Sequence, residues 1–261
     1  MSGRKYLYVW LKASALSLEA IFTTQGASLM YLAGKFIRFF FFLWLLIRLG
    51  SQIQKVSGFN LTQLITFFLV FNLFDMMGQI FFRGVYWFRQ EVINGQFDFK
   101  LLKPMSVLFQ VLTNRTDLLD IPLLVIVIVA LIKQGLMVPI PLNLWLLFGL
   151  MAAASIFLIT AVHIFAAALG VLTTEVDHTM MIYRDLSAMA RLPVDIYIRG
   201  IQLLLTVVVP VAVIMTFPAK ALLGLLHWPY VVFGLVISVF FMVITLKFWH
   251  YALSRYSSAS S

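Results

Sequence analysis

Four ionisable residues lie close together in the second half of the chain, and their types could bind a metal or transfer protons. Glu175, Asp177, His178 and Asp185 could serve a membrane enzyme that acts on lipid head groups. A zinc site, however, usually shows a second His at helical spacing, as in HExxH, or Cys ligands, and this chain has no Cys and no such motif. No known catalytic spacing organises the four residues. We therefore predict no catalytic residue, no bound metal and no cofactor in this chain.

A stripe of polar residues interrupts one long apolar segment. Asn72, Asp75 and Gln79 recur at helical spacing, which places them on one helix face. An ionised carboxylate facing lipid costs at least ~2.5 kcal/mol, so this stripe should face protein or a water-filled cavity. Lys35 and Arg38 lie at a similar depth in the preceding apolar segment, and we predict that Asp75 pairs with one of them. Such a pair could lock helix packing, contact a substrate, or carry a proton in a secondary transporter.

A single histidine, His163, lies in another apolar segment, which is rich in Ala and Gly. Small residues permit close contact between membrane helices. We therefore predict that His163 makes a hydrogen bond between helices rather than acting as a catalyst. A secondary transporter is often built from internal repeats with paired broken helices, and no convincing repeat is present here.

The composition predicts an integral membrane protein. Hydrophobic residues make up 62% of the 261 residues and the mean hydropathy is +1.01, whereas soluble domains are about 45–50% apolar. The chain has room for about six spans of roughly 20 residues, so we predict a single transmembrane domain over residues 1–261. The net charge of +9 does not indicate nucleic-acid binding, because the basic residues are scattered at span ends.

The expected fold is all-α, with six transmembrane helices. Five of these spans are clear: Ala27–Leu49, Leu61–Phe82, Leu118–Leu136, Leu142–Val171 and Tyr230–Trp249. The fifth span in chain order has two candidates. Hydropathy favours Ile196–Phe217, but Pro210 interrupts this segment, so it could instead be broken or re-entrant. In that case Glu175–Leu192 would be the fifth span.

The N-terminal residues 1–26 are predicted to form an amphipathic helix that lies at the membrane surface. One face carries apolar residues, and Lys5, Lys12 and Glu19 recur every seven residues on the other. A signal peptide is the alternative, but Lys12 interrupts its short apolar core. Basic residues near span ends predict that both termini are cytoplasmic. On this basis the cytoplasmic flanks hold Arg4, Lys5, Lys12, Arg83, Arg89, Lys100, Lys103, Arg115, Arg184, Lys247 and Arg255, against Arg48, Lys55, Lys133 and Lys220 outside.

Residues 83–117 form the longest predicted cytoplasmic link. Its first part can continue as a helix with Val85, Phe88 and Val92 on one face, and Asn94 and Gly95 supply residues that end helices. A short two-faced element follows and ends at Pro104. It is predicted to present an apolar face of Phe97, Leu101 and Leu102 and to display Asp98, Lys100 and Lys103. A plain loop would not need those apolar residues, so this element should pack on lipid or on another protein.

The stretch EVINGQFDFKLLKPMSVLFQ resembles the cytoplasmic signature of the ATP-binding-cassette (ABC) type-two permeases, in particular a bacterial branch of small six-span permeases. The similarity extends through RLPVDIY and VVPVAVIMTFPAKALLG, so it covers most of the chain. This resemblance implies a permease subunit that pairs with a second permease and with ATP-binding subunits in the bacterial inner membrane. It also implies a coupling helix within Arg83–Pro104, and short re-entrant helices after Pro193 on the outer side.

The sequence also predicts that any ATP is bound by another chain. It contains no GxxxxGK[ST] phosphate loop and no GxGxxG turn. ATP and Mg²⁺ are therefore expected in a partner subunit, and the leading function is an ATP-driven exporter. Within the coupling segment, the predicted contacts with the ATPase are Phe97, Asp98, Lys100, Leu101, Leu102 and Lys103. The secondary transporter and, less well supported, the lipid-modifying enzyme remain as alternatives.

Overall fold

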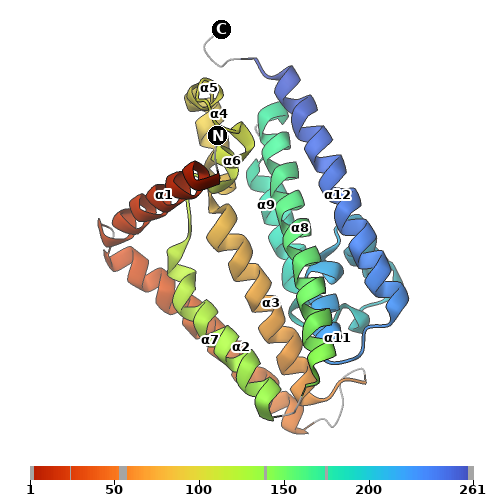
Figure 1. Ribbon diagram of the computed structural model, residues 1–261. Helices are drawn as coiled ribbons and strands as arrows, with labels where there is room; N and C mark the ends of the chain where they lie inside the picture. Colours follow the sequence, from red (N-terminus) through yellow and green to blue (C-terminus); the bar gives the residue numbers. More distant parts are fainter. Residues whose placement is uncertain (1–2, 24, 53–57, 138–139, 174–175, 258–261) are drawn as a thin grey trace.

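The computed structural model describes residues 3–23, 25–52, 58–137, 140–173 and 176–257, and every element within them is helical. Five described helices are long and apolar enough to cross a membrane, which confirms the five clear spans. They are α2 (Gln25–Gln52), α3 (Leu61–Phe82), the α7 span (η2, Leu118–Asp120, continuing into α7, Ile121–Met137), α8 (Leu142–Thr173) and α12 (Trp228–Arg255). Figure 1 shows them as a tilted bundle.

Helix α3 starts at a capping box that satisfies two of its free N-terminal groups. The Asn60 side chain accepts a hydrogen bond from the Gln63 backbone N–H at 2.9 Å, and the Gln63 side chain accepts from the Asn60 N–H at 3.0 Å. These two reciprocal bonds explain why the helix begins at Leu61, where hydropathy also places the start of the span.

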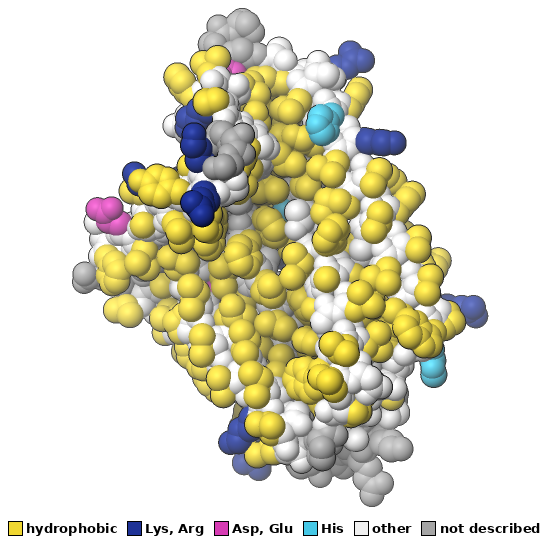
Figure 2. Space-filling view, in the orientation of Figure 1, with side chains coloured by type: hydrophobic (Ala, Val, Ile, Leu, Met, Phe, Trp, Pro, Cys, Tyr) yellow, Lys and Arg dark blue, Asp and Glu magenta, His cyan; other side chains and the backbone are white. Residues whose placement is uncertain are grey.

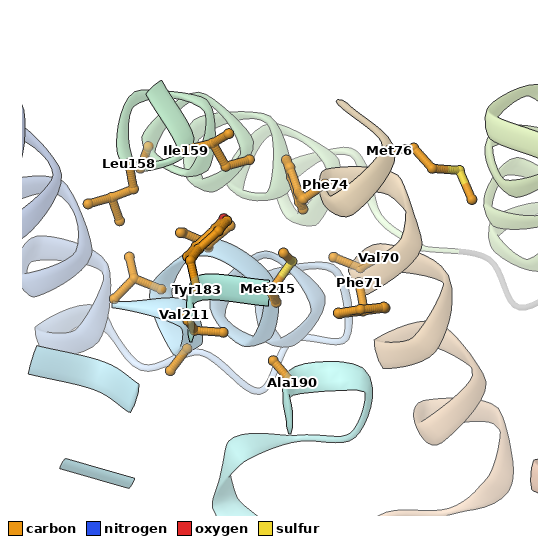
Figure 3. Packing of buried hydrophobic residues seen from close by; sticks show 14 of the residues in the cluster. Val70, Phe71, Phe74, Met76, Leu158, Ile159, Tyr183, Ala190, Val211 and Met215 are labelled. Carbon is orange, nitrogen blue, oxygen red and sulfur yellow. The ribbon is translucent and has the colours of Figure 1, made fainter. Parts of the chain in front are cut away.

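Helix α8 is the centre of the bundle. It packs along α12 and also contacts α3 and α11 (Phe217–Leu222). Several of its small residues, among them Ala161, Ala166 and Ala167, are fully buried, as expected for close helix contacts. Figure 3 shows Leu158 and Ile159 of α8 pointing toward side chains from α3 and from the chain that follows α9.

Between α8 and α12, the described residues 176–227 contain no straight helix long enough to span a membrane. Helix α9 (Val176–Ala188) has 13 residues, which rise about 20 Å at 1.5 Å per residue. It is followed by η3 (Met189–Arg191) and η4 (Val194–Ile196). The next helices, Arg199–Val208 and Ala212–Leu222, meet at an angle of 85°. They are built from α10 (Arg199–Leu203), η5 (Leu204–Val208), η6 (Ala212–Thr216) and α11.

The bend lies at Pro210, the residue that led us to expect a break. Residues 211–219 beyond the bend are almost completely buried and pack on α8 and α3. Irregular backbone at membrane depth is tolerated where protein surrounds it. The hydropathy-based span Ile196–Phe217 is therefore not a straight helix. Figure 1 shows α9 running beside α8 toward the end of the bundle where α11 lies.

The remaining elements gather at one end of the bundle. Figure 1 places the start of α1 (Gly3–Thr23), the end of α12 and the 83–117 elements there, and we call this the termini end. The 83–117 elements are η1 (Arg83–Trp87), α4 (Phe88–Ile93), α5 (Gln96–Leu101) and α6 (Val107–Thr113). Helix α1 lies across this end and exposes Leu7, Leu11 and Phe22. In Figure 2 the middle of the visible face is mostly hydrophobic and the Lys and Arg side chains lie at its margins.

Candidate functional site

A cavity of about 580 Å³ lies between α2, α3, the start of the α7 span and α9. Its walls carry eight charged side chains. The basic residues that line it are Lys35, Arg38, Arg83, Arg184 and Arg191, and the acidic ones are Asp75, Asp120 and Asp185. Asn72 and Gln79 line it as well, so the whole polar stripe of α3 faces this cavity and not lipid.

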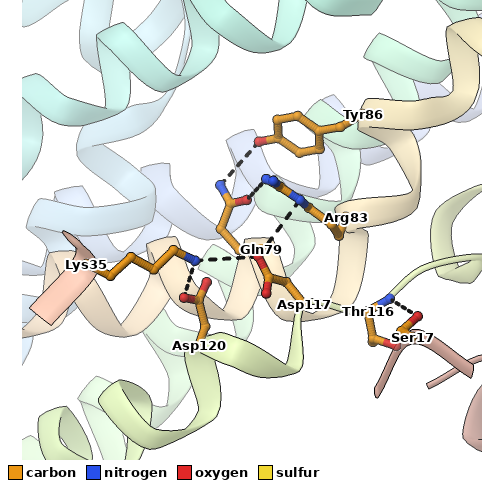
Figure 4. Close-up of polar contacts among 8 residues, drawn as sticks. All are labelled: Ser17, Lys35, Gln79, Arg83, Tyr86, Thr116, Asp117 and Asp120. Atoms are coloured by element: carbon orange, nitrogen blue, oxygen red, sulfur yellow. Dashed lines mark hydrogen bonds and ion pairs between the residues drawn. The ribbon is translucent and has the colours of Figure 1, made fainter. Parts of the chain in front are cut away.

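Lys35 does not pair with Asp75, contrary to one of the two pairings we predicted. Its ammonium contacts the carboxylate of Asp120 directly and lies 3.5 Å from Asp117 Oδ2 (Figure 4). The Arg83 guanidinium lies 3.8 Å from the same Asp117 oxygen. Both acids stand at the start of the α7 span, so these ion pairs join α2 and α3 to it. The physical reason is that two carboxylates, brought in from a distant segment, lie closer to Lys35 than Asp75 does.

Asp75 makes no ion pair within 4 Å to any residue that the structure describes, so a direct pair with Arg38 is also absent. Its carboxylate is attracted by four basic side chains around it, Arg38 foremost, followed by Arg184, Lys35 and Arg191. These side chains reach the cavity from three different helical segments. Asp75 is therefore held in a basic environment and not in a single closed pair.

The rest of the stripe makes hydrogen bonds within α3 and with two residues of η1. The Asn72 side chain donates to the Phe68 carbonyl at 2.7 Å. Gln79 donates to the Tyr86 hydroxyl at 3.3 Å and accepts from Arg83 at 2.9 Å (Figure 4). Gln79 thus links the stripe to the 83–117 segment.

His163 is buried, as expected for a packing residue, but it makes no hydrogen bond to another helix. Its Nδ1 lies 2.7 Å from the Ile159 carbonyl of its own helix, and Nε2 has no hydrogen-bond partner in the described structure. The ring instead packs on Phe82, with centroids 4.9 Å apart. The predicted contact between helices is therefore aromatic, because the ring reaches α3 beside Gly78, where no side chain intervenes.

The acidic residues around His178 do not form a site in the part of the chain that the structure describes. No group of three His, Asp or Glu residues there could hold a metal ion, and Glu175 lies outside the described residues. Asp177 pairs with Arg89 at 3.1 Å, while Asp185 lines the cavity. These two carboxylates therefore have separate settings and do not combine as a membrane enzyme would require.

At the termini end, α5 forms the short element that we predicted between two breaks. Gly95 adopts φ +69°, a left-handed conformation that favours glycine, and ends α4. Phe97 then turns fully inward, where its ring packs on Phe88 of α4 and on Tyr256 beyond α12. Phe97 is therefore an anchor of α5 and does not lie on its outer face.

Lys100, which we expected on display, is buried. Its ammonium lies 2.5 Å from Glu91 Oε2, and Glu91 also accepts a hydrogen bond from Asn114 at 2.5 Å. The Gln110 side chain donates to the Lys100 carbonyl at 3.1 Å. Burial lowers the pKa of Lys100, although the attraction of Glu91 opposes this change. The reason for the inward position is that Glu91 needs a buried cation, and Lys100 is the one that reaches it.

The outer face of α5 and of the turn after it is instead largely apolar. Leu102 is 81% exposed, Phe99 and Leu101 are exposed beside it, and Lys103 adds a positive charge. We call these four residues the α5 surface. Asp98 is half-buried and accepts a hydrogen bond from the Tyr256 hydroxyl at 3.0 Å, which ties α5 to the end of α12.

A comparison with known protein families identifies the class of membrane protein. The family described as ABC-2 family transporter protein matches residues 32–260, which is most of the chain. The chain belongs to this family. It is thus an ABC-2-type permease and a multi-pass membrane protein, as the resemblance implied. The matched range includes the α5 surface and every charged residue that lines the cavity. No curated protein and no solved structure shows significant similarity to it.

In this ABC-2 permease, three acidic residues were missed by our predictions about the site. Asp117 and Asp120 hold Lys35, and Glu91 holds Lys100. A signal for all three was present, because a carboxylate near or inside an apolar segment needs a cation. The particular partner could not be chosen, since Lys35 and Asp120 are 85 residues apart.

Proposed function

We propose that this chain is the membrane subunit of an ATP-driven exporter in a bacterial cytoplasmic membrane. A separate ATP-binding subunit, which also holds the Mg²⁺, docks on the α5 surface and drives the permease between two conformations. Both termini and the 83–117 segment face the cytoplasm. Family membership supports the permease role, and the resemblance of the chain to type-two ABC permeases motivates the proposed direction of transport.

The α5 surface is the observation that carries this proposal. It exposes Phe99, Leu101 and Leu102 side by side at the end of the molecule where the basic flanks predict cytoplasm. Exposed apolar side chains grouped in this way are typical of a protein contact. The helix that presents them is held by the buried Phe97 ring and by the Glu91–Lys100 pair. A push on α5 would therefore reach α4 and, through Tyr256, the end of α12.

The arrangement between α8 and α12 supports α9 as the fifth crossing. The chain leaves α8 at the termini end and must reach the opposite end before α12 begins (Figure 1). Helix α9 and the turns after it would make this passage, and the bent pair at Pro210 would form a re-entrant hairpin on the outer side, with its second arm, residues 211–219, buried against the bundle. Six crossings in total keep both termini on the same side.

A second permease subunit would complete the cavity. Arg38 and Arg184 are exposed on its open side at membrane depth. Charged side chains in that position are stable only against protein or water. A partner that covers this face, either a second copy or a related chain, would enclose the charges in an aqueous path between the two subunits.

Replacing Leu102 with Glu is expected to uncouple the ATPase. Burying a leucine contributes about 1.5–3 kcal/mol, so its loss should weaken docking roughly tenfold or more. The variant should insert and fold normally, because Leu102 is 81% exposed. Binding of the co-purifying ATP-binding subunit and ATP-dependent transport are measured together.

Ile198→Glu provides the matched control, since Ile198 is 74% exposed. It follows Asp195, which pairs with Lys220 of α11, and Figure 1 shows α11 away from the termini end. The control variant should retain both docking and transport. Wild-type coupling in Leu102→Glu would count against the docking surface, and the lack of any ATP-binding partner would overturn the function itself.

A further inference from the structure

The charges of the cavity do not cancel within the chain. Lys35 and Arg83 are engaged by Asp117 and Asp120 at the edge of the α7 span. Three cations then remain on the walls, Arg38, Arg184 and Arg191, and two carboxylates, Asp75 and Asp185. The cavity therefore carries an excess of positive charge in a part of the molecule where unneutralised charge is costly.

Two of these cations have free hydrogen-bonding groups. Arg38 and Arg184 make no hydrogen bond and no ion pair within 4 Å to the residues that the structure describes, although both attract Asp75 from a greater distance. Arg191 lies over the rings of Phe42 and Phe71, at 5.9 and 5.6 Å from their centroids. Those contacts orient the guanidinium without neutralising it. A planar guanidinium fork is suited to phosphate, sulfate or carboxylate, which it can bind through two hydrogen bonds.

The same cavity has an apolar part. Phe39, Met76, Leu123 and Met181 line it together with the arginines. The cavity is therefore lined by both charged and apolar side chains, so it can hold a charged group beside a hydrocarbon portion. Its volume of about 580 Å³ lies within the roughly 300–1,000 Å³ of ligand pockets.

We propose that this cavity binds an anionic amphiphile, with the anionic group on Arg38, Arg184 and Arg191 and the hydrocarbon portion on the apolar wall. That this ligand is the exported substrate rests on the proposed function. The binding itself does not, because it needs neither ATP nor the ATPase. A failure of ATPase docking and a failure of anion binding can thus be told apart.

The test is isothermal titration of the purified chain in a neutral maltoside detergent. Dodecyl phosphate, inorganic phosphate and dodecyltrimethylammonium serve as the amphiphilic anion, the soluble anion and the amphiphilic cation. Dodecyl phosphate is expected to bind best. If inorganic phosphate bound with equal affinity, the ligand would not need a hydrocarbon portion, and the proposal of an amphiphile would be wrong. If the cation bound equally well or more tightly, the proposed preference for an anion would be wrong.

Substitutions in the cavity test whether the arginines bind the anionic group. Arg38→Gln/Arg184→Gln should weaken dodecyl phosphate binding at least about tenfold, because each lost charge-assisted hydrogen bond costs roughly that factor. Lys133→Gln/Arg199→Gln removes the same charge outside the cavity and should leave the affinity unchanged. Asp185→Asn, which removes a competing carboxylate at an exposed position, should tighten binding several-fold.

Unchanged affinity in both the double arginine variant and Asp185→Asn would overturn the site. Light scattering on the same samples tests the alternative that a second copy of the chain, and not an anion, contacts these arginines. If the double arginine variant converted a dimer to monomers while wild type bound no anion, the arginines would hold a partner subunit and the proposal would be wrong.

Discussion

Glu91→Leu is expected to detach α5 from the bundle and to abolish coupling to ATP hydrolysis. Glu91 is the acceptor for both the Lys100 ammonium and the Asn114 side chain, at 2.5 Å each. Without it, Lys100 would be a buried cation with no counter-charge, and breaking such a pair costs about 3–5 kcal/mol. Thermal unfolding of the purified variant should show a large loss of stability, and ATP-dependent transport should fall to background.

The double variant Glu91→Leu/Lys100→Met separates charge from packing. It removes both ions and replaces them with side chains of similar volume, so it should recover most of the lost stability. Asp177→Leu is the matched control, because it breaks an exposed pair with Arg89 in which Asp177 is half exposed, and such pairs contribute about 0–1 kcal/mol. If Glu91→Leu were as stable as this control, Glu91 would not hold α5.

Asp120→Leu is expected to destabilise the junction of α2, α3 and the α7 span. Asp120 is only 2% exposed and contacts the Lys35 ammonium directly (Figure 4). Its loss leaves Lys35 with Asp117 alone, and Asp117 also serves Arg83. We expect a loss of about 3–5 kcal/mol in the free energy of unfolding, visible as a lower melting temperature and reduced yield of folded protein in the membrane.

Two further variants test whether this loss of stability comes from an unpaired buried charge. Lys35→Met/Asp120→Leu should restore stability, since no buried charge is then left alone. Asp195→Leu removes the acid of the Lys220–Asp195 pair, which is also short at 2.6 Å but has a partly exposed carboxylate, so it should change stability by about 1 kcal/mol or less. A double variant as unstable as Asp120→Leu alone would show that the site depends on shape and not on charge.

The long apolar spans could be predicted because their signal is local. Helix α3 begins and ends at the residues that hydropathy gives, Leu61 and Phe82, and α2, α7, α8 and α12 differ by a few residues. The segment after α8 could not be settled in the same way. Pro210 predicts a break, but the 85° turn depends on the packing of residues 211–219 against α8 and α3, which is a tertiary contact.

The polar contacts could be predicted only in part. The stripe of Asn72, Asp75 and Gln79 does face the cavity, because helical spacing alone determines that they share a face. The partner of Lys35 could not be found, since pairing across 85 residues leaves no periodic signal.

In the 83–117 segment, the breaks were predicted correctly, but the outward positions expected for Phe97 and Lys100 were wrong. Gly95 ends one helix, as its left-handed φ shows. That break also resets the direction in which the next helix points, so the face of α5 cannot be extrapolated from α4. As a result Phe97 and Lys100 face inward, toward Phe88 and Glu91, while Leu101 and Leu102 are exposed, as a contact surface requires.

Crosslinking from the α5 surface tests the docking of an ATPase most directly. The chain has no native cysteine, so Leu102→Cys can carry a single photoreactive label in intact membranes, with Ile198→Cys as the control at the opposite end. We predict that the Leu102 label crosslinks to an ATP-binding subunit and that the Ile198 label does not. Crosslinks to such a subunit from Ile198, or only to lipid from Leu102, would contradict the account.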